Sequence, residues 1–138
     1  MKNWLMRWHE LKRTHPKGVL YTISALLPMT IMLVVWYFMG SYPFGNKSLM
    51  AVDFGQQYIS FFGLLKNAVL SGDLSSLTYS FTKSLGGDMI VILGYYLMSP
   101  FNIIYIVLPF KYYGLAVVLT IWLRYGAIGI SFANLLIK

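Results

Sequence analysis

Three long apolar runs with almost no charge constrain what this chain can fold into. They cover residues 18–39, 89–108 and 114–137, and Arg124 is the one charged side chain inside them. Each run is close to the roughly 20 apolar residues that a helix needs to cross a bilayer. The apolar residues form continuous runs instead of recurring at helix or strand period, so the pattern predicts membrane-spanning helices.

The overall composition agrees with a membrane protein. Of the 138 residues, 58% are hydrophobic and 11% are charged, whereas a soluble domain carries about 25% charged residues. The net charge is +7, but the basic residues do not form a stripe that could follow the phosphates of a nucleic acid. No nucleic-acid partner is therefore expected. The absence of cysteine excludes disulfides and thiolate metal sites.

The basic residues gather before the first apolar run. Five of them lie there: Lys2, Arg7, Lys12, Arg13 and Lys17. Because cytoplasmic segments carry an excess of Lys and Arg, the N-terminus is expected in the cytoplasm, with the chain crossing the cell membrane several times. Residues 1–17 have apolar side chains near helical spacing, which fits either an interfacial helix or a disordered basic leader.

The first run is predicted to be an uncleaved span. Its apolar core is too long for a signal peptide, and aromatic residues 36–38 stand at its far end, where an interfacial belt is expected. Pro28 lies in mid-span, where a neighbouring helix would have to satisfy the carbonyl that it leaves free. The following segment, residues 40–88, is expected on the outer face, and Lys111 on the inner face.

Within the outer loop, residues 40–46 have the composition of a turn, and residues 56–70 are predicted to form an amphipathic helix on the membrane surface. Residues 71–88 are expected to be a polar loop. The second run is interrupted by Ser99-Pro100. It is interpreted as a full span, with a re-entrant piece as the alternative.

The fold class is therefore an all-α integral membrane protein. It has three transmembrane helices and a surface helix in the first outer loop. The second transmembrane helix is either a full span or a broken or re-entrant one. Residues 18–138 form its membrane domain. Three helices with a cation inside the membrane make an incomplete bundle, so further spans or partner helices are expected.

Asp53 is the first candidate for chemistry, because it is the only acid between Glu10 and Asp73 and stands near a membrane edge. Its spacing to Gln56 is that of a capping box, so it is either a helix cap or a general base or metal ligand. Arg124 is the second candidate. A cation at a helix centre costs roughly 2.5–3.5 kcal/mol on insertion scales, so it is expected either to pair within the protein or to bind an anion such as a lipid phosphate.

The remaining candidates are polar residues of the outer loop. Lys83 and Lys47 are either solvated or supplements to the anion site. Gln56, Gln57 and Tyr58 are either sugar ligands or an ordinary wet helix face. Gly86-Gly87-Asp88 is either a plain turn before a helix or a tight loop near the site. The pairs Tyr95-Tyr96 and Tyr112-Tyr113 are expected to be interface anchors rather than ligand stackers.

Four blocks of sequence resemble the N-terminal region of the bacterial YfhO-type membrane proteins. They are residues 42–48, 53–58, 80–89 and 95–102, with the sequences YPFGNKS, DFGQQY, SFTKSLGGDM and YYLMSPFN. Their order and spacing make the resemblance specific, and it runs from about Gly18 to the C-terminus. Members of this family are several times longer than 138 residues, so the resemblance implies that this chain is an N-terminal part.

The family is similar to the GT-C class of membrane glycosyltransferases. That likeness implies transfer of a sugar from a polyprenyl-phosphate donor to a cell-wall polymer, notably lipoteichoic acid, on the outer face. The class places a catalytic acid in the first outer loop, where this chain has Asp53. No cofactor is expected, and a divalent metal is left open. The alternative from another class is a non-catalytic membrane scaffold or a small-solute transport subunit.

Overall fold

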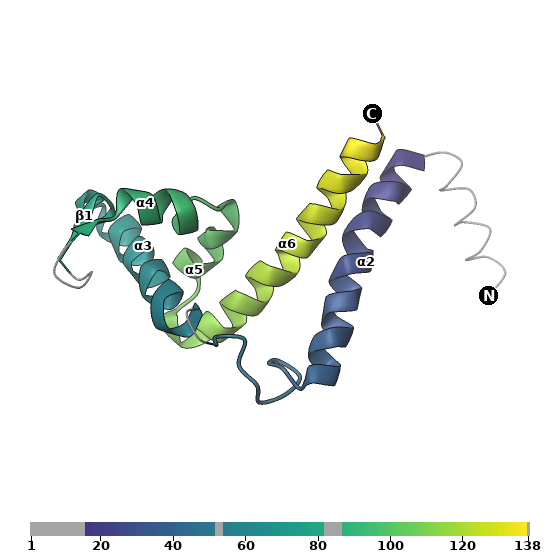
Figure 1. Ribbon diagram of the computed structural model, residues 1–138, viewed down its shortest axis with the longest axis horizontal. Helices are drawn as coiled ribbons and strands as arrows, with labels where there is room; N and C mark the ends of the chain where they lie inside the picture. The colour runs from purple at the N-terminus through teal and green to yellow at the C-terminus, as the bar shows by residue number, and fades with distance from the viewer. Residues whose placement is uncertain (1–15, 52–53, 82–86, 138) are drawn as a thin grey trace. The chain divides into compact units, whose positions relative to one another are not determined.

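The computed structural model describes residues 16–51, 54–81 and 87–137 (Figure 1). The chain divides into two compact units. One unit contains residues 1–39 and 121–138, and the other contains residues 40–120. Asp53 and Lys83 lie outside the described residues, as does most of the basic segment 1–17.

Two helices are long and apolar enough to cross a membrane. Helix α2 spans Pro16–Met39 and helix α6 spans Tyr113–Leu136. The corresponding candidate spans, Lys17–Met39 and Phe110–Leu136, have mean hydropathies of 2.0 and 1.7. They correspond to the first and third predicted spans, so the all-α membrane class is confirmed.

Helix α2 and residues 121–136 of α6 lie side by side with opposite chain directions (Figure 1). The Tyr21 hydroxyl donates to Asn134 Oδ1 at 2.9 Å, and Trp122 Nε1 donates to the Met29 carbonyl at 3.1 Å. As the residue number rises along α2, the number of its partner on α6 falls. The two helices are therefore antiparallel.

A small residue on α6 accommodates the proline in α2. Pro28 has no N–H, so the carbonyl of Ser24 loses its helical partner. Gly129 lies directly against that carbonyl, because a methyl group built on it would stand 1.8 Å from the Ser24 oxygen. The neighbouring helix therefore covers the free carbonyl, as the mid-span proline requires.

The unit of residues 40–120 is built around helix α3, Ile59–Ser71, which follows a short π-helical turn at Phe54–Tyr58. Together, these two elements correspond to the surface helix predicted over residues 56–70. Its apolar face packs on helix α5, Ile103–Val107, where the rings of Phe62 and Tyr105 stack with centroids 3.9 Å apart. Tyr113 is buried against Tyr105, so it is a core residue and not the interface anchor that was expected.

The second apolar run is a pair of short helical segments with a sharp break between them. Residues Ile90–Leu97, which include helix α4 (Ile90–Ile92), and residues Pro100–Val107 meet at 90°. The buried Asn102 amide closes the break by donating to the carbonyls of Tyr96 and Leu97 at 2.8 and 3.0 Å. These carbonyls end a helical segment and would otherwise lack partners.

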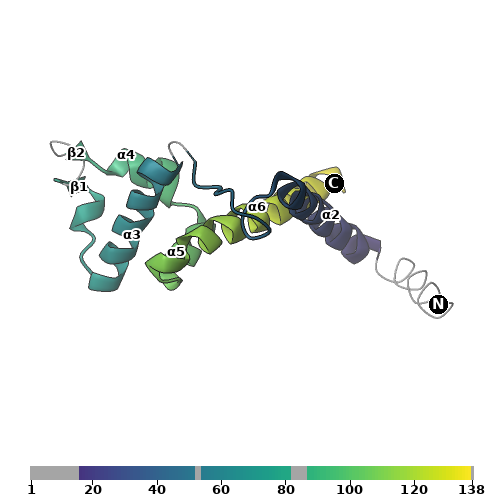
Figure 2. The same cartoon turned by 90° about the horizontal axis from the view of Figure 1, so that it is seen from below.

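Residues 71–88, expected to be a plain loop, contain regular structure. A 3₁₀ turn at Ser75–Leu77 leads into strand β1, Tyr79–Ser80, which pairs antiparallel with strand β2, Gly87–Asp88 (Figure 2). The predicted turn at residues 40–46 is present. Four backbone hydrogen bonds fold residues 40–47 back on themselves, and Gly40 has the positive φ of +64° that such a turn favours.

Candidate functional site

The two glutamines predicted to bind a sugar are exposed in the structure. Gln56 and Gln57 lie on the π-helical turn, which begins at the residue after Asp53. Nothing described in the unit covers their amides, so they are accessible to a ligand. The capping role considered for Asp53 falls outside the described residues.

Tyr58, by contrast, is a packing residue. Its ring stacks on Phe54 with centroids 5.4 Å apart and meets the Tyr96 ring edge-on at 4.5 Å. Tyr96 also stacks on Phe61 at 6.2 Å. These contacts hold the start of α3 against the bent pair, so the ring of Tyr58 fixes the direction in which the two glutamines emerge.

Asp88 stabilises the start of helix α4. Its Oδ1 accepts a hydrogen bond from the backbone N–H of Ile90 at 2.8 Å, which satisfies one of the free donors at the start of helix α4. The residue is exposed to solvent. Gly87 and Asp88 form strand β2, so the described part of residues 86–88 is a strand just before helix α4 and not a plain turn.

Arg124 belongs to the other unit and is half-buried on α6. It is not an isolated cation, because it already takes part in an interaction within the chain. The structure therefore groups Gln56, Gln57, Tyr58 and Asp88 in one unit and Arg124 in the other.

One buried lysine was not among the residues predicted for the site. Lys66 on α3 is 8% exposed, and its Nζ donates to the Leu108 carbonyl at 2.5 Å while lying 5.2 Å from the centre of the Phe110 ring. A cation at the C-terminal end of α5 satisfies a carbonyl that the helix leaves free. The available signal was that Lys66 is the only charge among residues 54–72, which are otherwise apolar or polar.

A groove of about 410 Å³ with both polar and apolar lining lies beside α3. It is lined by Ser60, Gly63, Leu64, Asn67, Ser76, Ser80 and Phe110. Ser60, Gly63 and Asn67 stand at helical spacing along one side of α3. Hydroxyl and amide groups beside one aromatic ring are suited to polyhydroxylated ligands, because they offer hydrogen bonds and one apolar face.

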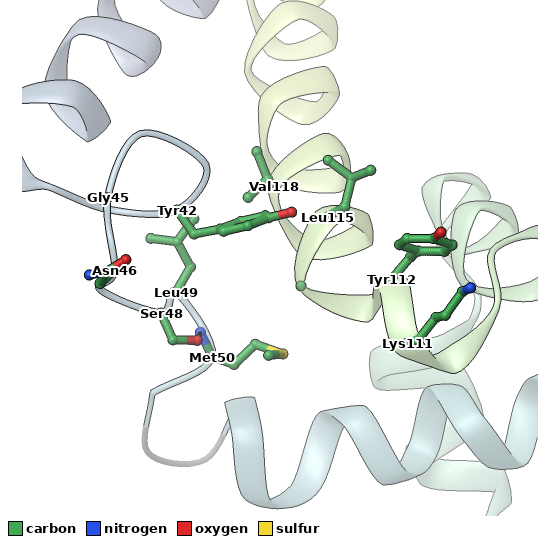
Figure 3. A pocket seen from close by; sticks show the side chains of 11 residues that line it. Tyr42, Gly45, Asn46, Ser48, Leu49, Met50, Lys111, Tyr112, Leu115 and Val118 are labelled. Atoms are coloured by element: carbon green, nitrogen blue, oxygen red, sulfur yellow. Dashed lines mark hydrogen bonds between the residues drawn. The ribbon is translucent and has the colours of Figure 1, made fainter.

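A second cavity of about 380 Å³ lies between the loop of residues 42–50 and the start of α6 (Figure 3). Its lining residues are Tyr42, Gly45, Asn46, Ser48, Leu49, Met50, Lys111, Tyr112, Gly114, Leu115 and Val118. Lys111 is their only charged residue, and its Nζ lies 4.8 Å from the centre of the Tyr112 ring. Tyr42 extends from the loop toward Leu115 and Val118. These two segments are more than 60 residues apart in the sequence, and no sequence pattern links them.

Within the described residues, no group of three or more His, Asp or Glu side chains stands close enough to hold a metal ion. Searches of curated proteins and of solved structures give no match. One family model does match, that of the bacterial membrane protein YfhO, and it covers residues 24–138. Because the match includes α2, the intervening unit and α6, this chain belongs to the YfhO family of bacterial membrane proteins.

Proposed function

We propose that this chain forms the N-terminal membrane part of a glycosyltransferase. The enzyme moves a sugar from a polyprenyl-phosphate donor to a cell-wall polymer such as lipoteichoic acid on the outer face of the membrane. Membership of the YfhO family supports the membrane setting. The likeness of that family to GT-C enzymes supports the reaction class. The observation that carries the proposal is the exposure of Gln56 and Gln57, which follow Asp53 in the sequence after Phe54 and Gly55.

The reaction needs one base and a stabilised leaving group. The acceptor hydroxyl oxygen bonds to the anomeric carbon, the bond from that carbon to the donor phosphate breaks, and its electron pair leaves with the phosphate. Asp53 accepts the hydroxyl proton. Because the phosphate leaves without an acid's help, one carboxylate suffices, and the single displacement inverts the anomeric centre, unlike the retaining double displacement.

Recognition of the substrates is divided among the other candidates. Arg124 and Lys83 are proposed to stabilise the negative charge of the donor phosphate. Gln56, Gln57 and Asp88 are proposed to bind sugar hydroxyls, with Tyr58 supporting the glutamines. The groove beside α3 is proposed to hold part of the acceptor, since its hydroxyl and amide groups can hydrogen-bond a polyol and its apolar surface can pack against the sugar ring.

The decisive experiment is Asp53→Asn in membranes that contain the full-length protein. Asparagine keeps a capping oxygen but is not a base, so a helix cap is preserved while general-base catalysis is lost. We expect sugar transfer to fall by about 10²–10⁴-fold. The assay measures labelled sugar that reaches the polymer, at matched protein levels.

The matched control is Asp73→Asn, a carboxylate in the same outer segment. Asp73 is exposed and accepts hydrogen bonds from Ser75, which an amide oxygen also accepts. We expect its activity to stay near that of the parent. If Asp53→Asn also stays within a few-fold of the parent, Asp53 is no base, and the scaffold or transport alternative is favoured.

A further inference from the structure

The antiparallel pairing of α2 and α6 limits how the chain crosses the membrane between them. Tyr21 pairs with Asn134 and Met29 with Trp122, so the two spans run in opposite directions. An even number of crossings must therefore separate Met39 from Tyr113. Three alternating spans would instead make α2 and α6 parallel.

Only the bent pair is a candidate for a further crossing between them in the described parts of the chain. Each of its halves, Ile90–Leu97 and Pro100–Val107, has eight residues, which makes about 12 Å of helix. With a bend of 90°, neither half approaches the roughly 30 Å of a hydrocarbon core. One crossing is also an odd number, so the bent pair must turn back to the face from which it came.

It follows that Lys111, just after the bent pair, lies on the membrane face where α2 ends. A separate observation agrees with this. Lys111 lines the same cavity as Asn46 and Ser48, which follow α2. This placement departs from the expectation that Lys111 is on the inner face. A single outer lysine is compatible with the positive-inside rule, because the basic cluster before the first span sets the orientation.

The cavity has two kinds of wall. Leu49, Met50, Leu115 and Val118 form an apolar wall, and the last two belong to the spanning helix α6. Asn46, Ser48 and Lys111 supply an amide, a hydroxyl and a cation, and none of the lining residues is acidic (Figure 3). An apolar wall continuous with a membrane span, beside a positive charge without a competing carboxylate, suits an anionic amphiphile.

We propose that this cavity binds the phosphate headgroup of an anionic lipid, with Lys111 as the anion-binding residue, on the face where α2 ends. The upper part of the lipid chain lies along Leu115 and Val118, and the phosphate accepts hydrogen bonds from Lys111 and Ser48. The ammonium group is available for this because its described neighbour is the face of the Tyr112 ring. The proposal does not depend on sugar transfer.

The first test is the membrane sidedness of Lys111. The chain has no cysteine, so single cysteines give no background. Cells that express Ser48→Cys, Lys111→Cys or Ile137→Cys are treated with a membrane-impermeant maleimide before and after lysis. We expect Ser48→Cys and Lys111→Cys to label in intact cells and Ile137→Cys to label only after lysis. If one of Ser48→Cys and Lys111→Cys labelled in intact cells and the other only after lysis, the two residues would lie on different membrane faces, and the proposal would be overturned.

The second test measures lipid binding by the purified full-length protein in an uncharged detergent. The probes are dioctanoyl phosphatidic acid, dioctanoyl phosphatidylcholine and inorganic phosphate, titrated by calorimetry. We expect phosphatidic acid to bind more tightly than phosphatidylcholine, and inorganic phosphate not to displace it. Lys111→Gln should weaken phosphatidic acid binding about tenfold, since it removes a charge-assisted hydrogen bond.

Two variants separate this site from a general effect of charge. Lys111→Arg should bind nearly as well as the parent, because it keeps the cation. Lys47→Gln removes an exposed lysine of the same loop that does not line the cavity, so its affinity should stay within about twofold. Equal losses in Lys111→Gln and Lys47→Gln, equal binding of the two lipids, or displacement by inorganic phosphate would each refute the lipid site.

Discussion

At the scale of single residues, two polar side chains buried in the 40–120 unit complete the ends of helical segments. Lys66 donates to the carbonyl of Leu108, and Asn102 donates to the carbonyls of Tyr96 and Leu97. An unpaired buried carbonyl costs about 1–3 kcal/mol, so these side chains allow short segments to end inside the protein. Neither role is visible in the sequence, because the partner carbonyls are set by the fold.

Asp73 provides a residue-scale prediction about pH. The Ser75 hydroxyl donates to its Oδ1 at 2.6 Å and the Ser75 backbone N–H at 3.0 Å, and these bonds lower the pKa of Asp73 below its usual 3.8. Hydrogen bonds to the carboxylate favour its charged form. The stabilisation is therefore fully present above pH 3.8 and is lost as the pH falls through the lowered pKa.

We expect Ser75→Ala to raise the pKa of Asp73 toward 3.8, because it removes the largest cause of the lowering. The measurement is an NMR titration of the Asp73 carboxyl carbon in the detergent-solubilised protein. Ser76→Ala, a change at the next residue, is the control and should leave the pKa unchanged. An unchanged pKa in Ser75→Ala would show that the hydroxyl bond does not form in solution.

At the scale of elements, the contact between α2 and α6 depends on the absence of a side chain. A methyl group at Gly129 would stand 1.8 Å from the Ser24 oxygen, and one at Gly126 would stand 2.6 Å from the Met29 sulfur. The sulfur belongs to a flexible side chain that can move, whereas the carbonyl belongs to the backbone. Close helix contact at small residues is a common means of association in membranes.

Gly129→Ala is therefore expected to lower the free energy of unfolding by about 1–3 kcal/mol, because the helices must separate. Thermal unfolding of the purified protein in detergent measures this loss. Gly94→Ala is the matched control, since a methyl group at Gly94 meets nothing within 4 Å. Equal melting temperatures for both variants would mean that α2 and α6 do not pack at Gly129.

The elements differ in how well the sequence predicts them. The surface helix over residues 56–70 appears as the π-helical turn and α3, Ile59–Ser71, because its apolar and polar residues are at helical spacing. The two-residue strands were not predicted, since so short a pair has no periodicity to detect. The break at Ser99-Pro100 was foreseen, but its 90° angle was not.

At the scale of the whole molecule, Arg124 carries the proposed contact with the donor phosphate. We expect Arg124→Gln, in the full-length protein, to weaken binding of the polyprenyl-phosphate donor more than it lowers the melting temperature. The reason is that a cation within a span is costly and is retained where it serves an anion. Donor titration and thermal unfolding in the same detergent provide the two measurements.

Lys17→Gln is the control for this substitution, because it removes a cation at the exposed start of α2. Both its donor affinity and its melting temperature should match those of the parent. Arg124 also takes part in an interaction within the chain. A collapse of stability in Arg124→Gln with unchanged donor affinity would assign the residue to structure alone.

The sequence by itself determined the membrane class and the positions of two spans. The predicted runs 18–39 and 114–137 became helices Pro16–Met39 and Tyr113–Leu136, because the bilayer thickness fixes the length of an apolar run. Candidate residues such as Asp53 and Arg124 stood out because charge is rare in such a chain. These signals are local, so one sequence was enough to reveal them.

The tertiary structure alone decided the direction of α6 relative to α2, the burial of Lys66 and the cavity beside Lys111. Each depends on residues far apart in the chain, such as Tyr21 with Asn134 and Lys66 with Leu108. Hydropathy reports how apolar a segment is but not whether a break turns it back to the same face. That outcome depends on which side chains satisfy the carbonyls at the break, and only the folded chain brings them there.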